Sequence, residues 1–310
     1  MIRNITVIGS GVMGSGIAQA FALAGYTVIL NDISEDYLER AKTRIIADLS
    51  LQIEEGVLAE KDEKKALDAI AYVVDLGLAV KEADYIIEAI PEVIVLKWEL
   101  YEKLAKLMKP TAIVASNTSS FPISLLSEHC DFADRMVITH FFNPAHLIPL
   151  VEIVQNKVTR PDVVTVTLEL IRSIGKSPVL LNKEIPGFIA NRLQIALARE
   201  VFHLLEEGVA SAEDIDLAIT AGPGFRWAFI GPIEIADFGG LDTWQRVFDN
   251  VAPVLNQSNQ APDSIRNLVS QGKLGTKSGE GIFKYDAMTV AHKIRERDRR
   301  FIRLGKIKGL

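Results

Sequence analysis

The fold is decided by one stretch near the N-terminus, Ile5-Thr6-Val7-Ile8-Gly9-Ser10-Gly11-Val12-Met13-Gly14. Its β-branched run predicts a strand, and the Gly-x-Gly-x-x-Gly loop that follows opens an apolar helix over residues 16–24. In such loops the first glycine allows the tight turn, the second lets backbone N–H groups approach a pyrophosphate, and the third lets helix and strand lie close. The sequence therefore predicts a dinucleotide-binding loop.

A second apolar run, Tyr26–Asn31, ends beside Asp32. A carboxylate at this position accepts hydrogen bonds from the adenosine ribose 2′-hydroxyl and repels a 2′-phosphate, so the predicted cofactor is NAD and not NADP. The alternative is a glycine-rich turn that binds nothing, which leaves Gly14 and Asp32 unexplained. The predicted cofactor-binding residues are Gly9, Gly11, Val12, Met13, Gly14 and Asp32.

The composition is typical of a two-domain globular protein, because 48% of the 310 residues are hydrophobic and supply a large core. A net charge of −6 argues against a nucleic-acid partner. The single cysteine, Cys130, excludes an intramolecular disulfide and a cysteine-cluster metal site, and no metal is predicted. We expect no signal peptide and no membrane partner, since the longest apolar stretch, residues 16–30, is too short to span a bilayer. The expected location is cytoplasmic.

Two domains are predicted. Strand and helix signals alternate through residues 1–185, which predicts a Rossmann-type α/β domain with a doubly wound, mostly parallel sheet. After Pro186 apolar residues recur with helical period, which predicts an all-α domain over residues 186–310. Ser34 and Ser211, each followed by acidic residues, predict helix N-termini. The predicted strands lie near residues 4–9, 26–31, 72–75, 84–89, 112–116, 136–141, 149–154 and 178–182.

Polar side chains follow two of the predicted strands, at the edge where an open α/β sheet leaves its crevice. One polar run is Ser116–Ser120, and the other begins at His140. A dehydrogenase that oxidises an alcohol needs a base near neutral pH, and histidine suits this role. Glu152, on the next strand end, is placed to orient His140 and to stabilise its imidazolium form. The alternative is a structural histidine beside an exposed glutamate. The other four histidines lack such a context, although His146 lies close by in sequence.

Five motifs, in chain order within residues 3 to about 285, closely resemble the L-3-hydroxyacyl-CoA dehydrogenases. They are Ser116-Asn117-Thr118-Ser119-Ser120, His140-Phe141-Phe142-Asn143-Pro144, Leu150-Val151-Glu152, Pro186-Gly187-Phe188-Ile189-Ala190-Asn191-Arg192 and Gly275-Thr276-Lys277-Ser278-Gly279-Glu280-Gly281. The resemblance implies an NAD-binding domain followed by a helical dimerisation domain, and hence a homodimer. It also implies reversible oxidation of a 3-hydroxyacyl-CoA, of short chain in our interpretation, to the 3-ketoacyl-CoA in fatty acid metabolism.

The same resemblance implies roles for individual residues. His140 is the catalytic base and Glu152 its partner. Ser119 hydrogen-bonds the reacting oxygen of the substrate, and Asn191 also contacts the substrate. The implied cofactor contacts are Asp32, Glu92, Lys97, Ser119, Asn143 and Lys277. The residue pattern alone indicates that the two lysines in that set lie on the surface.

One departure from the family bears on the substrate. The segment 222–232 contains Arg226 and Trp227, and it is similar to gulonate 3-dehydrogenase (lambda-crystallin) and carnitine dehydrogenase, relatives that oxidise small hydroxy acids without coenzyme A. A guanidinium can hold a free carboxylate, and a tryptophan can wall a small pocket. In the alternative, Arg226 pairs with a neighbouring acid and Trp227 belongs to the core. Because His140 is followed by Phe-Phe-Asn-Pro, as in the acyl-CoA branch, the sequence favours an acyl-CoA substrate.

A second departure is the tail, where residues 293–308 contain eight Lys or Arg side chains and two acids. This tail could pack on a partner subunit, attract coenzyme A phosphates or form a solvated surface, and a structural or solvated role is favoured. A non-enzymatic NAD-binding protein, such as a redox sensor, is the other functional class that fits the loop. Such a protein has no need for the four implied catalytic residues together, so the intact set favours an enzyme.

Overall fold

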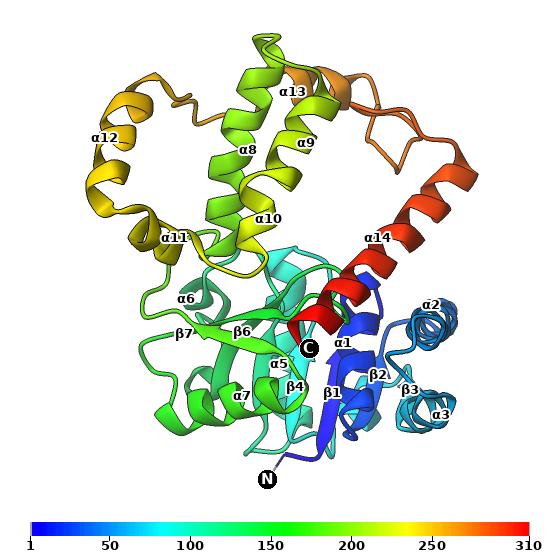
Figure 1. Cartoon of the computed structure of the whole chain (residues 1–310). Helices are drawn as coiled ribbons and strands as arrows, with labels where there is room; N and C mark the ends of the chain where they lie inside the picture. The colour runs from blue at the N-terminus through cyan, green and yellow to red at the C-terminus, as the bar shows by residue number, and fades with distance from the viewer. Residues whose placement is uncertain (1, 310) are drawn as a thin grey trace. The chain divides into compact units, whose positions relative to one another are not determined.

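The computed structural model describes residues 2–309 of the chain (Figure 1). The chain divides into two compact units. The first runs to Ile189 and includes the C-terminal segment that begins at Arg297, and the second is Ala190–Glu296. Within residues 2–309, no helix is long and apolar enough to cross a membrane, and no three His, Cys, Asp or Glu side chains are placed to hold a metal ion.

An eight-stranded sheet lies at the centre of the first unit. The strand order is β3-β2-β1-β4-β5-β6-β7-β8, and all neighbouring strands are parallel except β6 and β7. The predicted doubly wound, mostly parallel sheet is confirmed, with each strand within two residues of its predicted range. The strands are β1 (Asn4–Ile8), β2 (Thr27–Asn31), β3 (Ile70–Val73), β4 (Tyr85–Glu88), β5 (Ile113–Ser116), β6 (Met136–Phe141), β7 (Leu150–Gln155) and β8 (Ser177–Leu180).

Helices cover both faces of this sheet. Successive side chains of a strand point to opposite faces, and neighbouring residues of β4 accordingly belong to different hydrophobic clusters. Ile86 packs in the cluster that contains Leu104, and Ile87 packs in the cluster that contains Phe21. The helices of this part of the chain are α1 (Val12–Leu23), α2 (Glu35–Glu54), α3 (Glu60–Asp68), α4 (Leu76–Val80), α5 (Ile94–Leu107), α6 (Ile123–Leu126) and α7 (Pro161–Ser173).

The second unit is helical. Its helices are α8 (Ala190–Glu206), α9 (Ala212–Ala221), α10 (Pro223–Trp227), α11 (Pro232–Gly239), α12 (Leu241–Val251), α13 (Asp263–Ser270) and the first turns of α14 (Ala287–Lys308). The Ser211 hydroxyl accepts a hydrogen bond from Asp214 N–H, as Ser34 does from Asp36 N–H at the start of α2, so both predicted helix starts are confirmed.

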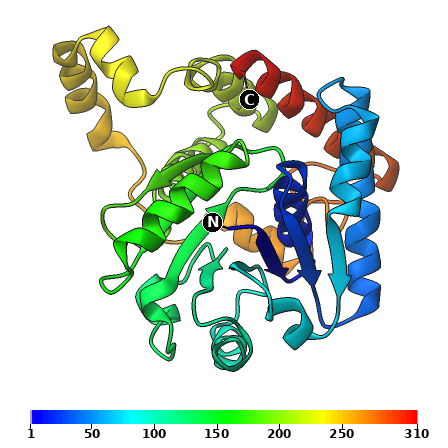
Figure 2. The ribbon, with the colours of Figure 1, turned by 90° about the horizontal axis from the view of Figure 1, so that it is seen from below.

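The last turns of α14, from Arg297 on, belong to the first unit, whereas the sequence assigns the whole tail to the helical domain (Figure 2). Ion pairs and one buried apolar side chain hold these turns against the end of α2. Arg303 Nε lies 2.8 Å from Glu55 Oε2, and an Arg299 guanidinium nitrogen lies 3.3 Å from Glu54 Oε2 at the end of α2. Ile302, between these arginines, is buried. Part of the basic character of the tail is thus neutralised within the same chain.

Candidate active site

The glycine loop after β1 has the geometry of a dinucleotide-binding loop. Gly9 has a φ of +97°, and a Cβ there would lie 2.6 Å from the carbonyl oxygen of Ala89. A Cβ on Gly14 would overlap the carbonyl oxygen of Gly9, whereas a Cβ on Gly11 would meet nothing within 4 Å. Packing therefore requires the first and third glycines, and the space at Gly11 leaves room for a ligand at the N-terminus of α1.

Asp32 lies beside this loop, directly after β2. Its Oδ2 accepts hydrogen bonds from the N–H and the hydroxyl of Ser10 at 2.6 and 2.7 Å, and Oδ1 accepts one from Ile33 N–H at 2.7 Å. These bonds fix the carboxylate where an adenosine ribose is bound in this type of fold. Val12 and Met13 form the start of α1, and no side chain in the described part of the protein caps that helix end. The loop and the acid therefore fit NAD.

Replacing Asp32 with alanine is expected to lower the preference for NADH over NADPH at least about tenfold, because the variant loses a charge-assisted hydrogen bond to the ribose and a charge that repels a 2′-phosphate. The ratio of kcat/KM for the two cofactors measures this preference. Ser10→Ala is the matched control, since it removes a partner of the same carboxylate and keeps the charge. A wild-type enzyme that uses NADPH as efficiently as NADH would refute the ribose argument.

A histidine and a glutamate form a buried pair at the antiparallel step of the sheet. His140 on β6 is directly opposite Glu152 on β7, which brings the two side chains together. His140 Nδ1 lies 2.9 Å from Glu152 Oε2, and both side chains are buried. With Nδ1 held by the carboxylate, Nε2 is the nitrogen that can exchange a proton with a substrate. This geometry excludes the alternative of an exposed glutamate.

The surroundings hold the pair in place. Ile189 N–H donates a hydrogen bond of 2.8 Å to Glu152 Oε1, so both carboxylate oxygens are engaged. The rings of Phe142 and Phe188 lie 4.7 and 5.4 Å from the His140 ring, measured between centroids. The bonded carboxylate orients the His140 ring and faces the charge that its imidazolium form would carry. The arrangement is suited to a general base.

Ser119 lies in the loop after β5, at the same carboxyl edge of the sheet. It is exposed, and its N–H donates a 3.0 Å hydrogen bond to Glu92 Oε1 in the loop after β4. Lys97 Nζ lies 3.2 Å from Glu92 Oε2, and the Lys97 side chain is only 1% exposed. The surface position indicated for Lys97 by its residue pattern is therefore wrong, because two carboxylates bury its ammonium. The second of these is Glu88, at 2.7 Å, which the sequence analysis missed.

The remaining implied site residues are placed as follows. Asn143 is exposed in the loop after β6. Asn191 lies in the first turn of α8 in the helical unit, where it is half-buried. Lys277 is exposed in the same unit, as its residue pattern indicates. His140, Glu152, Ser119 and Glu92 thus belong to one unit, on its strands or in the loops that follow them, and the roles of all these residues stay predictions.

His146 has a structural environment, distinct from that of the dyad. It packs against α1, where a Cβ on Gly16 would lie 3.4 Å from its Nδ1, and that nitrogen lies 3.8 Å from Asp48 Oδ2 on α2. Burial, followed by the charges of Lys176 and Arg297, lowers the pKa of His146 to about 4. A neutral, buried imidazole between two helices has the character of a packing residue.

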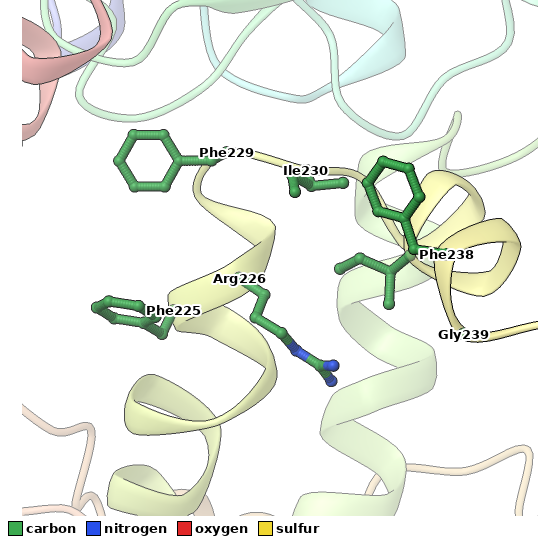
Figure 3. Close-up of a pocket in the computed structure, with 7 residues that line it drawn as sticks. Phe225, Arg226, Phe229, Ile230, Phe238 and Gly239 are labelled. Carbon is green, nitrogen blue, oxygen red and sulfur yellow. The ribbon is translucent and has the colours of Figure 1, made fainter.

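A pocket of about 490 Å³ surrounds Arg226 in the helical unit. Figure 3 shows Arg226 among the residues that line the pocket, with its guanidinium pointing away from Phe229 and Ile230. Within residues 2–309 no acidic side chain forms an ion pair with Arg226, which rules out the predicted alternative of a neighbouring acid. Trp227 does not line this pocket and is 42% exposed, so it is neither the predicted wall of this pocket nor core. The lining residues are Phe225, Arg226, Phe229, Ile230, Ile235, Phe238 and Gly239.

Comparison with known families gives two matches that together cover nearly the whole chain. The NAD-binding domain of 3-hydroxyacyl-CoA dehydrogenase matches residues 4–185, and the C-terminal domain of 3-hydroxyacyl-CoA dehydrogenase matches residues 187–285. The second match ends just before α14 begins at Ala287.

Individual relatives differ in the substrates that their names give. The 5-formyl-3-hydroxy-2-methylpyridine 4-carboxylate 5-dehydrogenase of Mesorhizobium japonicum is 36% identical over 99% of this chain and 98% of its own length. Hydroxyacyl-coenzyme A dehydrogenase of Rattus norvegicus is 38% identical over 92% of each chain, and L-carnitine dehydrogenase of Bacillus cereus is 36% identical over 92% of this chain and 88% of its own. A solved structure of a 5-formyl-3-hydroxy-2-methylpyridine 4-carboxylic acid 5-dehydrogenase, described as an NAD⁺-dependent dismutase, is 35% identical, with a TM-score of 0.93 over 99% of this chain and 98% of that one.

Proposed function

Because this chain belongs to the 3-hydroxyacyl-CoA dehydrogenase family and is an NAD-dependent oxidoreductase, we propose that it oxidises a hydroxyl group with the His140–Glu152 dyad as general base. The observation that carries this proposal is the buried 2.9 Å contact between His140 Nδ1 and Glu152 Oε2. Bound NAD supplies the hydride acceptor. His140 Nε2 takes the hydroxyl proton as the hydride leaves the same carbon, and the Glu152 carboxylate stabilises the imidazolium that forms.

Ser119 and the nucleotide loop complete this proposal. The Ser119 hydroxyl, exposed at the carboxyl edge of the sheet, donates a hydrogen bond to the reacting oxygen, and the oxygen stays oriented as its charge changes. Asp32 holds the adenosine ribose, and Glu92, Lys97, Asn143 and Lys277 are proposed cofactor contacts. Asn191 is a proposed substrate contact.

We propose that the substrate is a small hydroxylated carboxylate that carries no coenzyme A. Arg226 lines a mostly apolar pocket and has no ion-pair partner among residues 2–309, and a bidentate carboxylate suits its guanidinium. The relative that matches over 99% of this chain, α14 included, is named for a pyridine carboxylate, and another is named for carnitine. Both names denote small carboxylates.

A 3-hydroxyacyl-CoA is the second candidate substrate, and it is the one that the sequence favours. The matching family is named for it, and so is the rat relative at 38% identity. A side-by-side assay separates the two candidates. We expect NAD reduction with gulonate, carnitine or an aromatic hydroxy carboxylate, and no NADH oxidation with acetoacetyl-CoA. Turnover of acetoacetyl-CoA alone would favour the second candidate and refute the first.

We also propose that the protein is a homodimer formed by the helical unit. In the described part of that unit only two hydrophobic side chains, Ile215 and Ile235, are buried, whereas large apolar side chains of α8 and α12 are exposed. Leu193, Ile195 and Phe248 are each more than 60% exposed.

Phe248→Glu is expected to shift the molecular mass measured by light scattering from dimer to monomer, because it places a charge in the apolar face of α12. Lys64→Glu, an exposed change on α3, serves as the control and is expected to stay dimeric. A wild-type mass of one chain at micromolar concentration would contradict the proposal.

A further inference from the structure

Glu88, the last residue of β4, is a fully buried carboxylate that takes no part in the dyad. Its Oε1 accepts hydrogen bonds from Lys97 Nζ at 2.7 Å and from Ile90 N–H at 2.9 Å. Its Oε2 accepts hydrogen bonds from the hydroxyls of Ser116 and Tyr101 at 2.6 and 2.9 Å. A charge is tolerated in a protein interior only when it is paired and hydrogen-bonded, and here four donors meet that demand. Glu88 is therefore a rigid anchor.

Lys97 connects the buried Glu88 to the partly exposed Glu92. Its ammonium lies between Glu88 Oε1 at 2.7 Å and Glu92 Oε2 at 3.2 Å. The Glu88 side chain is fully buried, the Lys97 side chain is 1% exposed, and the Glu92 side chain is 34% exposed. The three charges form a chain that begins at the buried end of β4 and ends at the partly exposed Glu92 in the loop that follows β4.

Glu92 holds the loop that follows β5. Its Oε1 accepts hydrogen bonds from the Thr118 hydroxyl at 2.5 Å, from the N–H groups of Ser119 and Ser120 at 3.0 Å each, and from the Ser120 hydroxyl at 2.8 Å. Burial acts to raise the pKa of Glu92, but the Thr118 hydrogen bond and the charge of Lys97 outweigh it and leave that pKa below its ordinary value. An ionised Glu92 thus fixes the backbone on both sides of the Ser119 side chain.

We propose that Glu88 is a positioning residue that acts, through the ion-pair chain to Glu92, on the loop that carries Ser119. The Lys97 ammonium is held on one side by a carboxylate that cannot move, so it presents a fixed charge to Glu92 on its other side. Loss of the Glu88 charge frees Lys97 and loosens the loop. The inference rests on the proposed function for its kinetic consequence, because only that function gives Ser119 a substrate to contact.

Hydrogen–deuterium exchange of the intact protein tests the positioning directly. In Glu88→Gln the side chain keeps its shape and loses its charge, and we expect the amides of Ser119 and Ser120 to exchange on the order of tenfold faster, as for a lost hydrogen bond to a charged group. Tyr101→Phe is the matched control, because it removes one hydrogen bond from the same carboxylate and keeps the ion pair. Its loop is expected to exchange at the wild-type rate.

Two results of this experiment would overturn the proposal. One is unchanged exchange of the loop in Glu88→Gln, and the other is equal acceleration in Glu88→Gln and Tyr101→Phe. If Glu88→Gln does not fold, Lys97→Met takes its place, because it removes the ammonium that joins Glu88 to Glu92. The same faster exchange of the Ser119 and Ser120 amides is then expected. No substrate is needed, so this measurement decides the positioning even if the proposed function fails.

A double-mutant cycle on kcat tests the consequence for catalysis. If Glu88 acts through Ser119, Glu88→Gln lowers kcat in the wild-type background but adds no more than about twofold to the loss in Ser119→Ala. If Glu88 had only a structural role, the losses in kcat of the two single variants would multiply in the double variant. That result would overturn the proposal. If instead Ser119→Ala alone had no effect while His140→Ala abolished turnover, the role of Ser119 would fail and the dyad would stand.

Discussion

The His140→Ala variant is expected to lose about 10²- to 10⁴-fold in kcat, the range that a general base contributes, while its affinity for NADH stays unchanged. The imidazole acts on the hydroxyl proton, and the nucleotide loop with Asp32 lies on other strands of the sheet. Steady-state kinetics gives kcat, and the change in NADH fluorescence gives the dissociation constant. Unchanged turnover in His140→Ala would remove His140 as the base.

Two further variants sharpen this result. Glu152→Gln keeps the shape of the partner and removes the charge that stabilises the imidazolium, so we expect a loss in kcat smaller than that of His140→Ala. Ile189 N–H still has an oxygen to bind if the amide is suitably oriented, which limits the structural disturbance. His129→Ala is the control and should leave kcat unchanged, because His129 is exposed and, within residues 2–309, its ring packs only against that of Trp98.

The parts of the site that follow from strand order could be predicted from the sequence. Each strand of the sheet has its own apolar run, and the glycine loop marks the first turn between a strand and a helix. The order of strands and helices along the chain could therefore be predicted. The hydrogen bond between His140 and Glu152 was also predictable, because both residues stand at strand ends that a short loop joins. The structure contains that bond, and its catalytic role stays a prediction.

The charge network at Glu88 could not be predicted in the same way. A lysine four residues into an amphipathic helix normally faces solvent, and nothing local to Lys97 shows that two acids will enclose it. The one hint in the sequence is that the apolar run Tyr85-Ile86-Ile87 ends on an acid, Glu88. Burial of a charge depends on partners distant in sequence, such as Ser116, and these become neighbours only when β4 and β5 pair.

The tail shows the same limit. Its excess of basic residues was evident, but its partners, Glu54 and Glu55, lie at the end of a helix about 250 residues earlier in the chain. The family match ends at residue 285, so the family pattern did not describe α14 either. Lys306 also donates a hydrogen bond to the carbonyl oxygen of Glu55. Because α14 lies outside the family match, its position follows from its tertiary contacts.

The substrate determines the expected result for Arg226→Ala. If the substrate is a small carboxylate, the variant loses a charge-assisted contact of about 1.5–3 kcal/mol, which corresponds to about 10- to 100-fold in kcat/KM. We expect this loss to appear mainly in KM, because a carboxylate remote from the reacting carbon is bound equally in the ground state and the transition state. The measurement is kcat/KM on the best substrate of the panel, compared with the wild type.

Arg246→Ala provides the matched control for that experiment. Arg246 is also an exposed arginine of the helical unit, but it already pairs with Asp242 at 3.3 Å, so its loss should leave kcat/KM unchanged. A thioester has no free carboxylate at its acyl end for Arg226 to bind, and an enzyme specific for acyl-CoA would show only a modest effect in Arg226→Ala. A small effect together with turnover of acetoacetyl-CoA would therefore reject the carboxylate proposal, whereas a large effect with no acyl-CoA activity would leave Arg226 as the residue that selects the substrate.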